Sequence, residues 1–251
     1  MKQDKWIAVL LVVAAAMPHA IPAVEVITRG PTAEKKLALV FTGHEFGEGG
    51  EAILNGLARR KARASFFLTG DFLANPQFQP LLARIVRGGH YLGPHSDKHL
   101  LYCTWDGSRK LRVTREEFRA DLEANLEKIE RLGRKRSEVR FFLPPYEHYN
   151  QQIAEWTAEM GLNLINFTPG TRSNADYTEE RDPKFVPSRV IFESIVTRER
   201  SDPAGLNGFI LLLHMGAGPG RADKFHVRFG ELLDFLATRN CRLVRVDELL
   251  R

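Results

Sequence analysis

The stretch Leu37-Ala38-Leu39-Val40-Phe41 is the strongest indication of the fold in this chain. Five apolar residues in an unbroken run are typical of a strand that is buried on both faces of a parallel sheet. Similar short runs recur along the chain, and most are followed by a longer segment with helical spacing of its apolar residues. We expect strands at residues 37–41, 64–68, 90–93, 141–143, 162–167, 208–214 and 243–246, and helices at residues 49–60, 81–86, 114–132, 150–160, 187–200 and 225–238.

This alternation predicts the α/β class, with a mainly parallel sheet and helices outside it. About seven strand–helix units, with no internal repeat and no linker, indicate one domain built as a closed or nearly closed (β/α) barrel. In such barrels the chemistry gathers at the carboxyl ends of the strands. Residues that follow the strands are therefore the candidates for a functional site.

The composition suits a globular domain with a substantial core, since 43% of the 251 residues are hydrophobic. The formal net charge of +5 is spread along the chain, and arginine-rich pieces fall where helices are expected to end. Cations there complement the helix dipole, so we expect no nucleic-acid partner. Cys103 and Cys241 either form one disulfide or remain two separate thiols, because sequence alone says nothing about their distance.

Residues 1–23 have the pattern of a signal peptide. Lys2 and Lys5 precede an uncharged apolar stretch, and small residues follow, with cleavage expected after Ala23. The apolar stretch is too short for a comfortable membrane span, and an uncleaved anchor is the alternative. We therefore expect residues 24–251 to work outside the cytoplasm, in the periplasm, at the cell surface or secreted, with no stable membrane insertion after cleavage.

Two histidines four residues apart, His95 and His99, follow a Gly-Pro pair. If a helix begins after Pro94, both side chains lie on one face and converge. Convergent imidazoles are a common start of a site for zinc, cobalt, nickel or iron. The alternative is a pair of solvated or core histidines that hold no ion, because this spacing alone is weakly diagnostic.

The ends of the other strands favour the metal site, since five expected strands deliver titratable residues to one rim. Independent placement of so many such residues would be an unlikely accident. The first strand is followed by His44 and Glu45, and the strand at residues 208–213 ends directly in His214. The residues that we expect to form the site are His44, Glu45, His95, His99, Pro145, Tyr146, Glu147, Asp176 and His214.

These motifs resemble the polysaccharide deacetylases of carbohydrate esterase family four, the NodB-homology domains. The likeness covers roughly residues 35–250 and rests on H-S-D-K-H at 95–99, P-P-Y at 144–146 and L-L-H at 212–214. It implies a distorted (β/α) barrel and a reaction that removes N-acetyl groups from amino sugars. It also implies that His95 and His99 bind a divalent metal, usually Zn²⁺, with an aspartate as third ligand, and that His214 is the general acid.

The first motif departs from that pattern. Where the family has F-D-x-D, this chain has F-T-G-H at residues 41–44. Thr42 thus replaces the aspartate that acts as general base, and His44 replaces the metal-binding aspartate. Leu143 replaces the arginine that orients the catalytic carboxylate. The two replacements are consistent with each other, because the arginine has no carboxylate to orient when the aspartate is absent.

Two arrangements of the site follow. In the first, His44, His95 and His99 bind the ion and leave a position open for water. Glu45, or with less support Glu147, then accepts the proton of that water, and His214 protonates the leaving amine. In the second arrangement Glu45 is itself the third ligand and His44 points elsewhere.

The expected function is that of an exported, metal-dependent hydrolase that removes N-acetyl or O-acetyl groups from an amino-sugar polysaccharide or oligosaccharide. Pro145, Tyr146, Glu147 and Asp176 are expected to bind this glycan, and Asp176 has the alternative of a hydrogen bond to His214. The altered first motif supports a different hypothesis, a catalytically silent carbohydrate-binding descendant of the same barrel. Retention of a histidine in the acid position favours the enzyme.

Overall fold

The computed structural model describes residues 24–251, so the expected signal peptide lies outside the described residues. The central strand is β1, Lys36–Gly43, which lies between β2, Ser65–Leu68, and β6, Ile210–His214. Beyond β2 lies β3, Tyr91–Pro94, and β7, Arg242–Val244, pairs with the first residues of β1. All four pairings are parallel, which confirms the α/β class.

The side chains of β1 alternate between two cores, as the pleat of a strand requires. Leu37, Leu39 and Phe41 belong to a large core that is shared with the surrounding helices. Ala38 and Val40 belong to a smaller core, to which β2, β3, β6, β7 and β4 (Phe141–Phe142) also contribute. Its remaining members are the residues that directly follow β4 and β5 (Asn163–Leu164), together with Val246 and Leu249. A core with contributions from the whole set of strands is the interior of a barrel. The unbroken apolar run is thus explained by burial on both faces.

The remaining strands are short and complete the barrel irregularly. Phe141–Phe142 (β4) and Asn163–Leu164 (β5) form a separate two-stranded parallel sheet. Leu143 N donates to Pro94 O at 3.4 Å, which connects β4 to β3. On the other side, residues 27–30 lie between β5 and the start of β6 and form isolated bridges to each. The barrel is therefore completed by isolated bridges and individual hydrogen bonds rather than by continuous hydrogen-bond ladders between strands.

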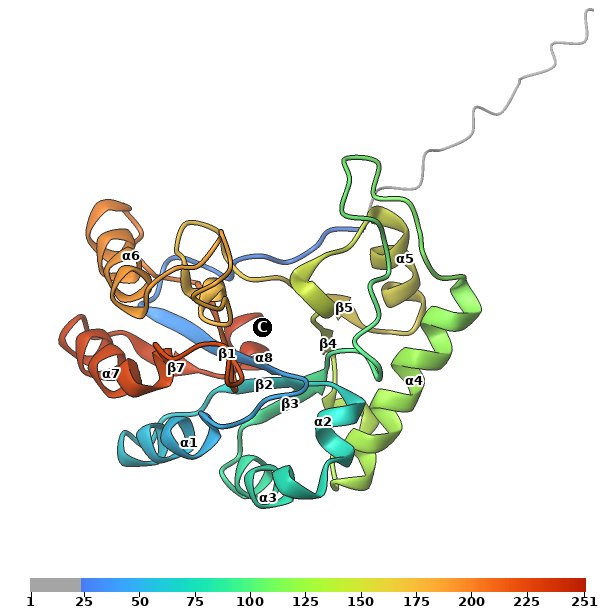
Figure 1. Cartoon of the computed structure of the whole chain (residues 1–251), viewed down its shortest axis with the longest axis horizontal. Helices are drawn as coiled ribbons and strands as arrows, with labels where there is room; N and C mark the ends of the chain where they lie inside the picture. Colours follow the sequence, from blue (N-terminus) through green and yellow to red (C-terminus); the bar gives the residue numbers. More distant parts are fainter. Residues whose placement is uncertain (1–23) are drawn as a thin grey trace, which may run out of the picture.

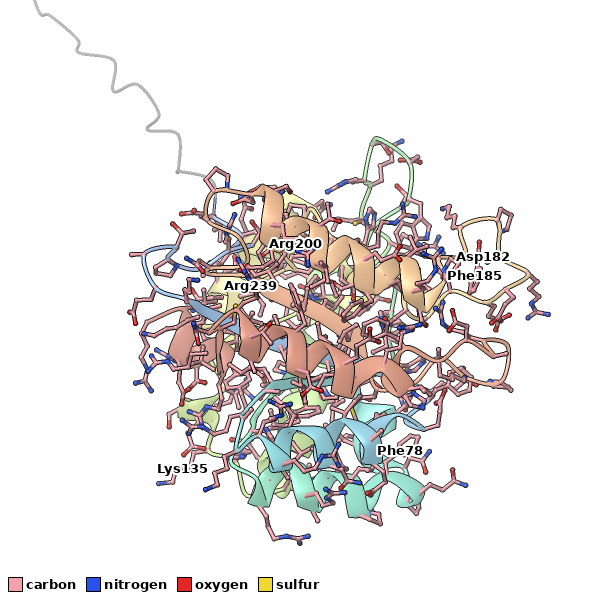
Figure 2. The ribbon with its side chains drawn as sticks, turned by 90° about the vertical axis from the view of Figure 1, so that its left-hand side faces the viewer. Phe78, Lys135, Asp182, Phe185, Arg200 and Arg239 are labelled. Carbon is pink, nitrogen blue, oxygen red and sulfur yellow. The ribbon has the colours of Figure 1, made fainter. Side chains whose placement is uncertain are left out.

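The helices surround this barrel (Figure 1). In Figure 2, α6, α7, α1 and α3 lie side by side, and the loop that carries Asp182 and Phe185 projects at one edge. None of the helices within residues 24–251 combines the length and apolar character needed to cross a bilayer. The helices are α1 Gly50–Arg59, α2 Gly70–Ala74, α3 Gln79–Arg87, α4 Arg115–Arg131, α5 Gln151–Glu159, α6 Ser188–Ser201, α7 Phe229–Thr238 and α8 Val246–Leu249, with 3₁₀ turns at Pro76–Phe78, Arg136–Glu138, Pro145–Glu147, Ser173–Ala175 and Phe225–Arg228.

Most predicted elements are present, and the differences are local. The capping box predicted for the helix at residues 114–132 is formed, since the Thr114 and Glu117 side chains each accept from the other residue's backbone N–H. The strand predicted at residues 162–167 is reduced to two residues, because residues 27–30 and not a full strand lie beside it. The last strand ends earlier than predicted, and α8 follows it. Cys103 and Cys241 are both free thiols.

No helix begins directly after Pro94, so the condition under which helical spacing would bring His95 and His99 together is not met. Residues 95–99 form a loop in which Ser96 and His99 have φ values of 74° and 54°. These left-handed conformations do not fit a right-handed helix. His95 and His99 still lie together, with ring centroids 5.2 Å apart, but the loop conformation and not helical periodicity places them there.

Candidate active site

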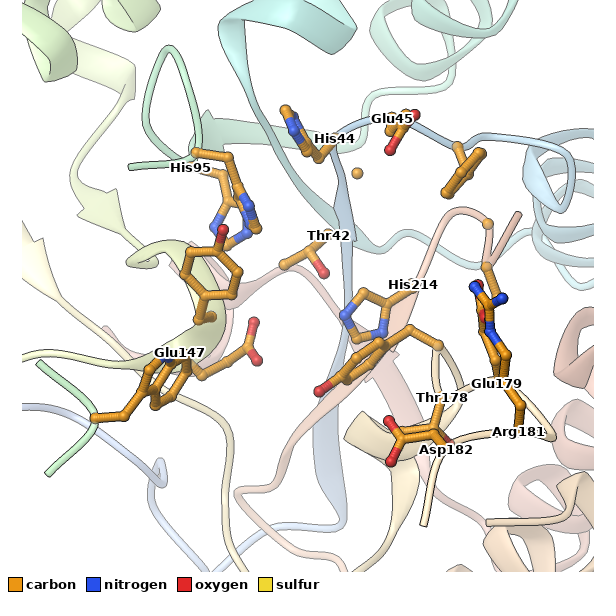
Figure 3. Close-up of a pocket in the computed structure, with 18 residues that line it drawn as sticks. Thr42, His44, Glu45, His95, Glu147, Thr178, Glu179, Arg181, Asp182 and His214 are labelled. Carbon is orange, nitrogen blue, oxygen red and sulfur yellow. The ribbon is translucent and has the colours of Figure 1, made fainter. Parts of the chain in front are cut away.

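A cavity of about 680 Å³ lies at the carboxyl ends of the strands (Figure 3). It contains most of the predicted site residues. Pro145 is buried and does not line the cavity, and Asp176 lies behind His214. The predicted residues that do line it are His44, Glu45, His95, His99, Tyr146, Glu147 and His214.

His95 is held in one orientation by a backbone carbonyl. Its Nδ1 atom lies 2.7 Å from Leu143 O and donates to it, which leaves Nε2 as the unprotonated nitrogen. Burial lowers the pKa of His95 to about 3, although the bond to Leu143 opposes this shift. Burial and the neighbouring histidines lower the pKa of His99 to about 2. Both imidazoles are therefore neutral at physiological pH, which is the form that binds metals.

Two polar residues of α4 hold the 95–99 loop in place. Asp121 accepts hydrogen bonds from the backbone N–H groups of Asp97 and Lys98 and from the Tyr102 hydroxyl. Asn125 accepts from His95 N and donates to Leu68 O, so it connects the loop to β2. These contacts provide hydrogen-bond partners for the backbone N–H groups of a buried turn, which lacks the hydrogen bonds of a helix or strand. Our sequence reasoning missed both residues, although polar side chains near the apolar stripe of the helix were a signal.

The three histidines adjoin but do not converge on a point. The rings of His44 and His99 are nearly parallel, with an interplanar angle of 15° and centroids 4.5 Å apart. Metal ligation requires nitrogen atoms that point at one place about 2.0–2.1 Å away. Accordingly, no three His, Cys, Asp or Glu residues within 24–251 are arranged to hold a metal ion as they stand. The three imidazoles are suitable ligands for a metal ion, but their rings would have to turn before the nitrogen atoms pointed at one ion.

His214 is paired with Asp176 across the cavity from this cluster. Its Nδ1 atom lies 2.6 Å from Asp176 Oδ1, so Nε2 is left for other partners. Burial by itself lowers the pKa of His214, but the charge and hydrogen bond of Asp176 and the charge of Glu147 outweigh it. The pKa of His214 is therefore above its usual value. Of the two alternatives for Asp176, the hydrogen bond to His214 is the one that the structure contains.

The two candidate proton acceptors differ in environment. The Glu45 side chain is exposed at the cavity edge. The Glu147 carboxylate points into the cavity toward Thr42 and His214 (Figure 3). Burial raises the pKa of Glu147 to about 7, with the charge of His214 opposing this shift and that of Asp176 adding to it. The Thr42 hydroxyl is buried and has no hydrogen-bond partner among residues 24–251.

Aromatic side chains line the cavity walls while remaining open to solvent. Trp105 is 61% exposed, Tyr177 51% and Tyr146 43%. Trp105 stacks on His148 and meets the edge of Tyr146, which forms one aromatic wall. Exposed rings at a cleft are suited to stacking on the apolar faces of sugar rings.

The opposite wall is the segment at residues 176–187, which contributes Tyr177, Glu179, Arg181 and Asp182 to the cavity. The fully buried Arg221 supports this segment by donating to the carbonyl groups of Thr178 and Val186. Sequence reasoning identified only Asp176 in this segment and missed the residues that line the cavity, because the segment has no motif and lies in a loop after a very short strand.

Fold and site together define a (β/α)-barrel protein with a histidine-lined cleft at the carboxyl ends of its strands. The sequence profile described as polysaccharide deacetylase matches residues 29–165, which is more than half of the chain. The chain therefore belongs to the polysaccharide deacetylase family.

Similar proteins agree with this assignment. A peptidoglycan-N-acetylglucosamine deacetylase of Bacillus cereus is 25% identical over 142 residues, which are 57% of this chain and 47% of that protein. This chain thus matches about half the length of that relative. A solved peptidoglycan N-acetylglucosamine deacetylase has a TM-score of 0.70 at 20% identity, with 89% of this chain and 92% of that one covered. A CE4-family pseudoenzyme from Bacillus anthracis has a TM-score of 0.68 at 20% identity, with 90% and 69% covered.

Proposed function

We propose that this protein is an exported, metal-dependent hydrolase that removes N-acetyl groups from an amino-sugar glycan. The observation that carries the proposal is the His214–Asp176 pair, which faces three adjoining imidazoles across one cavity. Family membership and the similarity to the deacetylase of Bacillus cereus support the reaction type, and suggest peptidoglycan N-acetylglucosamine as a substrate. Removal of an O-acetyl group is a related reaction that the same site would permit.

His95, His99 and His44 are the proposed ligands of a divalent metal, with Zn²⁺ the ion that three imidazoles suit best. The centroids of the His44 and His99 rings lie 4.5 Å apart, and this proximity supports His44 as third ligand once the rings turn so that their nitrogen atoms point at one ion. Glu45 is the alternative ligand. When bound, such an ion polarises the acetyl carbonyl and lowers the pKa of a water molecule.

His214 is the proposed general acid. Because Asp176 accepts from Nδ1, the proton on Nε2 is the one that can pass to the nitrogen of the leaving amine. The Asp176 carboxylate, which raises the pKa of His214, favours retention of that proton. Tyr146 and the two other exposed rings, Trp105 and Tyr177, are the proposed sugar-binding surfaces, and the carboxylates Glu45 and Glu147 are the candidates for accepting the proton of water.

The proposal is tested with purified protein that has been loaded with one equivalent of Zn²⁺, using tetra-N-acetylchitotetraose and measuring released acetate. Turnover by the wild type is expected, together with loss of turnover in both His95→Ala and His214→Ala. His95→Ala should also lose the metal, whereas His214→Ala should retain it. Absence of acetate release with zinc, cobalt, nickel or iron would contradict the proposal.

A carbohydrate-binding protein without turnover is the second candidate. It is favoured by Thr42, which leaves the first motif without its usual general base, by Leu143, which stands in place of the usual arginine, and by the pseudoenzyme among proteins with the same fold. This candidate predicts binding of the same oligosaccharide with no acetate released. Calorimetry with the glycan, run beside the acetate assay, distinguishes the two candidates.

A further inference from the structure

We propose that Glu147 is the general base of this active site, in the role for which the sequence favoured Glu45. The inference rests on the proposed deacetylase function and specifies how a chain with Thr42 in its first motif would activate water. It assigns the base to the loop after β4 instead of the loop after β1.

The first support is position. Glu147 and Thr42 line the same cavity as His214, and the Glu147 carboxylate is directed into the space between them (Figure 3). Within residues 24–251 the carboxylate forms no hydrogen bond, so its oxygen atoms are available for water or substrate. Glu45, in contrast, has an exposed side chain at the cavity edge.

The second support is a backbone conformation that places Glu147 in the cavity. Tyr146 and Glu147 have φ values of 59° and 52°, and neither is glycine. Two consecutive left-handed residues are unfavourable and persist only where the surroundings hold them. Here Glu147 N donates to Pro144 O at 3.0 Å, and the side chain of the buried Asn166 donates to Glu147 O at 2.8 Å. Such strain is characteristic of positions that aim a functional side chain.

The third support is charge. Burial raises the pKa of Glu147 to about 7, with His214 opposing the shift and Asp176 adding to it. A base works best when its pKa lies near the working pH, because it is then partly ionised and still strong enough to take a proton. His214, whose pKa is also raised, supplies the complementary acid. The titratable groups that face the pair are Asp176, Tyr177 and, across the cavity, the imidazoles of His95 and His99.

The step is balanced in atoms and protons. Water forms a bond to the acetyl carbonyl carbon and transfers one proton to the Glu147 carboxylate. The carbon–nitrogen bond then breaks, and the amine nitrogen takes a proton from Nε2 of His214. The products are acetic acid, which ionises in solution, and the free amino sugar. Transfer of the proton from Glu147 to His214 restores both groups for the next cycle.

The test compares Glu147→Gln, Glu45→Gln and, as a matched surface control, Glu130→Gln on α4, each loaded with Zn²⁺. Glu147→Gln is expected to lower kcat on tetra-N-acetylchitotetraose by about 10²–10⁴-fold, as expected for loss of a general base. Its bound zinc should remain at one equivalent, and its KM should change by less than about threefold. Glu130→Gln should match the wild type.

A measurement without turnover checks the position of the group. Because the charge of Glu147 raises the pKa of His214, the His214 ring should titrate at lower pH in Glu147→Gln when followed by NMR. If Glu147→Gln folds poorly, Glu147→Asp keeps a carboxylate on a shorter side chain and should show a smaller loss of kcat.

Three results would overturn the assignment. They are near-normal turnover in Glu147→Gln, a large loss of kcat in Glu45→Gln without one in Glu147→Gln, and loss of zinc in Glu147→Gln, which would make the residue a ligand. An inactive wild type would overturn the deacetylase function and the base together. An active wild type with an active Glu147→Gln variant would overturn only the base.

Discussion

Asp176 holds both the ring and the main chain of His214. Its Oδ1 atom lies 2.6 Å from Nδ1 of the imidazole, and its Oδ2 atom accepts from the His214 backbone N–H at 3.0 Å. Asp176 is buried, and it follows the 3₁₀ turn Ser173–Ala175, which packs against β6. A loop residue and the last residue of β6, 38 positions apart in sequence, thus produce one oriented imidazole.

We predict that Asp176→Asn lowers the pKa of His214. Burial lowers this pKa, and the Asp176 carboxylate is the first group that opposes it, so removing its charge shifts the balance. A raised folded-state pKa adds stability below the unfolded value, and this stability is lost as pH rises through the folded value. The variant should therefore lose more stability at acidic than at alkaline pH.

The measurement is an NMR titration of the His214 ring, assigned with His214→Ala, together with denaturant unfolding at two pH values. Turnover should fall by as much as about 10²–10⁴-fold, the range for loss of general acid–base catalysis. An unchanged titration of His214 would contradict the prediction.

We predict that a chelator removes activity without unfolding the protein. The large core is formed by apolar residues of strands and helices and contains none of the three histidines, so its packing does not depend on the ion. The chelated protein should keep its circular dichroism spectrum and regain activity with Zn²⁺.

His44→Ala should weaken zinc binding by at least the roughly 10- to 100-fold that groups bonded to the ligands contribute. Retention of zinc by His44→Ala, with loss in Glu45→Gln, would identify Glu45 as the third ligand.

We predict that Asp121→Ala disturbs the 95–99 loop. The change leaves the N–H groups of Asp97 and Lys98 and the hydroxyl of Tyr102 without their hydrogen-bond acceptor. Each buried donor left without a partner costs about 1–3 kcal/mol. The free energy of unfolding and the zinc affinity should both fall, and Asp121→Asn, which keeps one acceptor oxygen, should show a smaller effect. Equal losses in the two variants would indicate that Asp121 acts only through its charge.

We predict that Trp105→Ala raises KM for the oligosaccharide about tenfold, which corresponds to about 1.4 kcal/mol of stacking and burial. Trp105 is largely exposed, so the free energy of unfolding should change by less than about 0.5 kcal/mol. The matched control is Val227→Ala, which truncates another exposed apolar side chain that does not line the cavity. A change in kcat without a change in KM would argue against a sugar-binding surface.

The strand residues show why much of the fold could be predicted from the sequence. The apolar run of β1 is buried on both faces, and burial of this kind requires an apolar side chain at nearly every position. The same reasoning failed for β5, where two residues pair and the neighbouring segment at 27–30 completes the barrel. That segment has one apolar residue, Ile27, which packs against the smaller core, and a single residue gives no periodicity that would indicate its place beside β5 and β6.

The α/β class, the order of strands and helices, and most of the residues that follow the carboxyl ends of the strands could be predicted from the sequence. These features depend on local periodicity and chain order, which a single sequence contains. Which of these residues meet depends on the tertiary fold. The contact of His44 with His99, the pairing of His214 with Asp176 and the inward direction of Glu147 depend on loop conformations with left-handed residues and on buried partners from distant elements. Such contacts are products of packing, so spacing along the chain does not predict them.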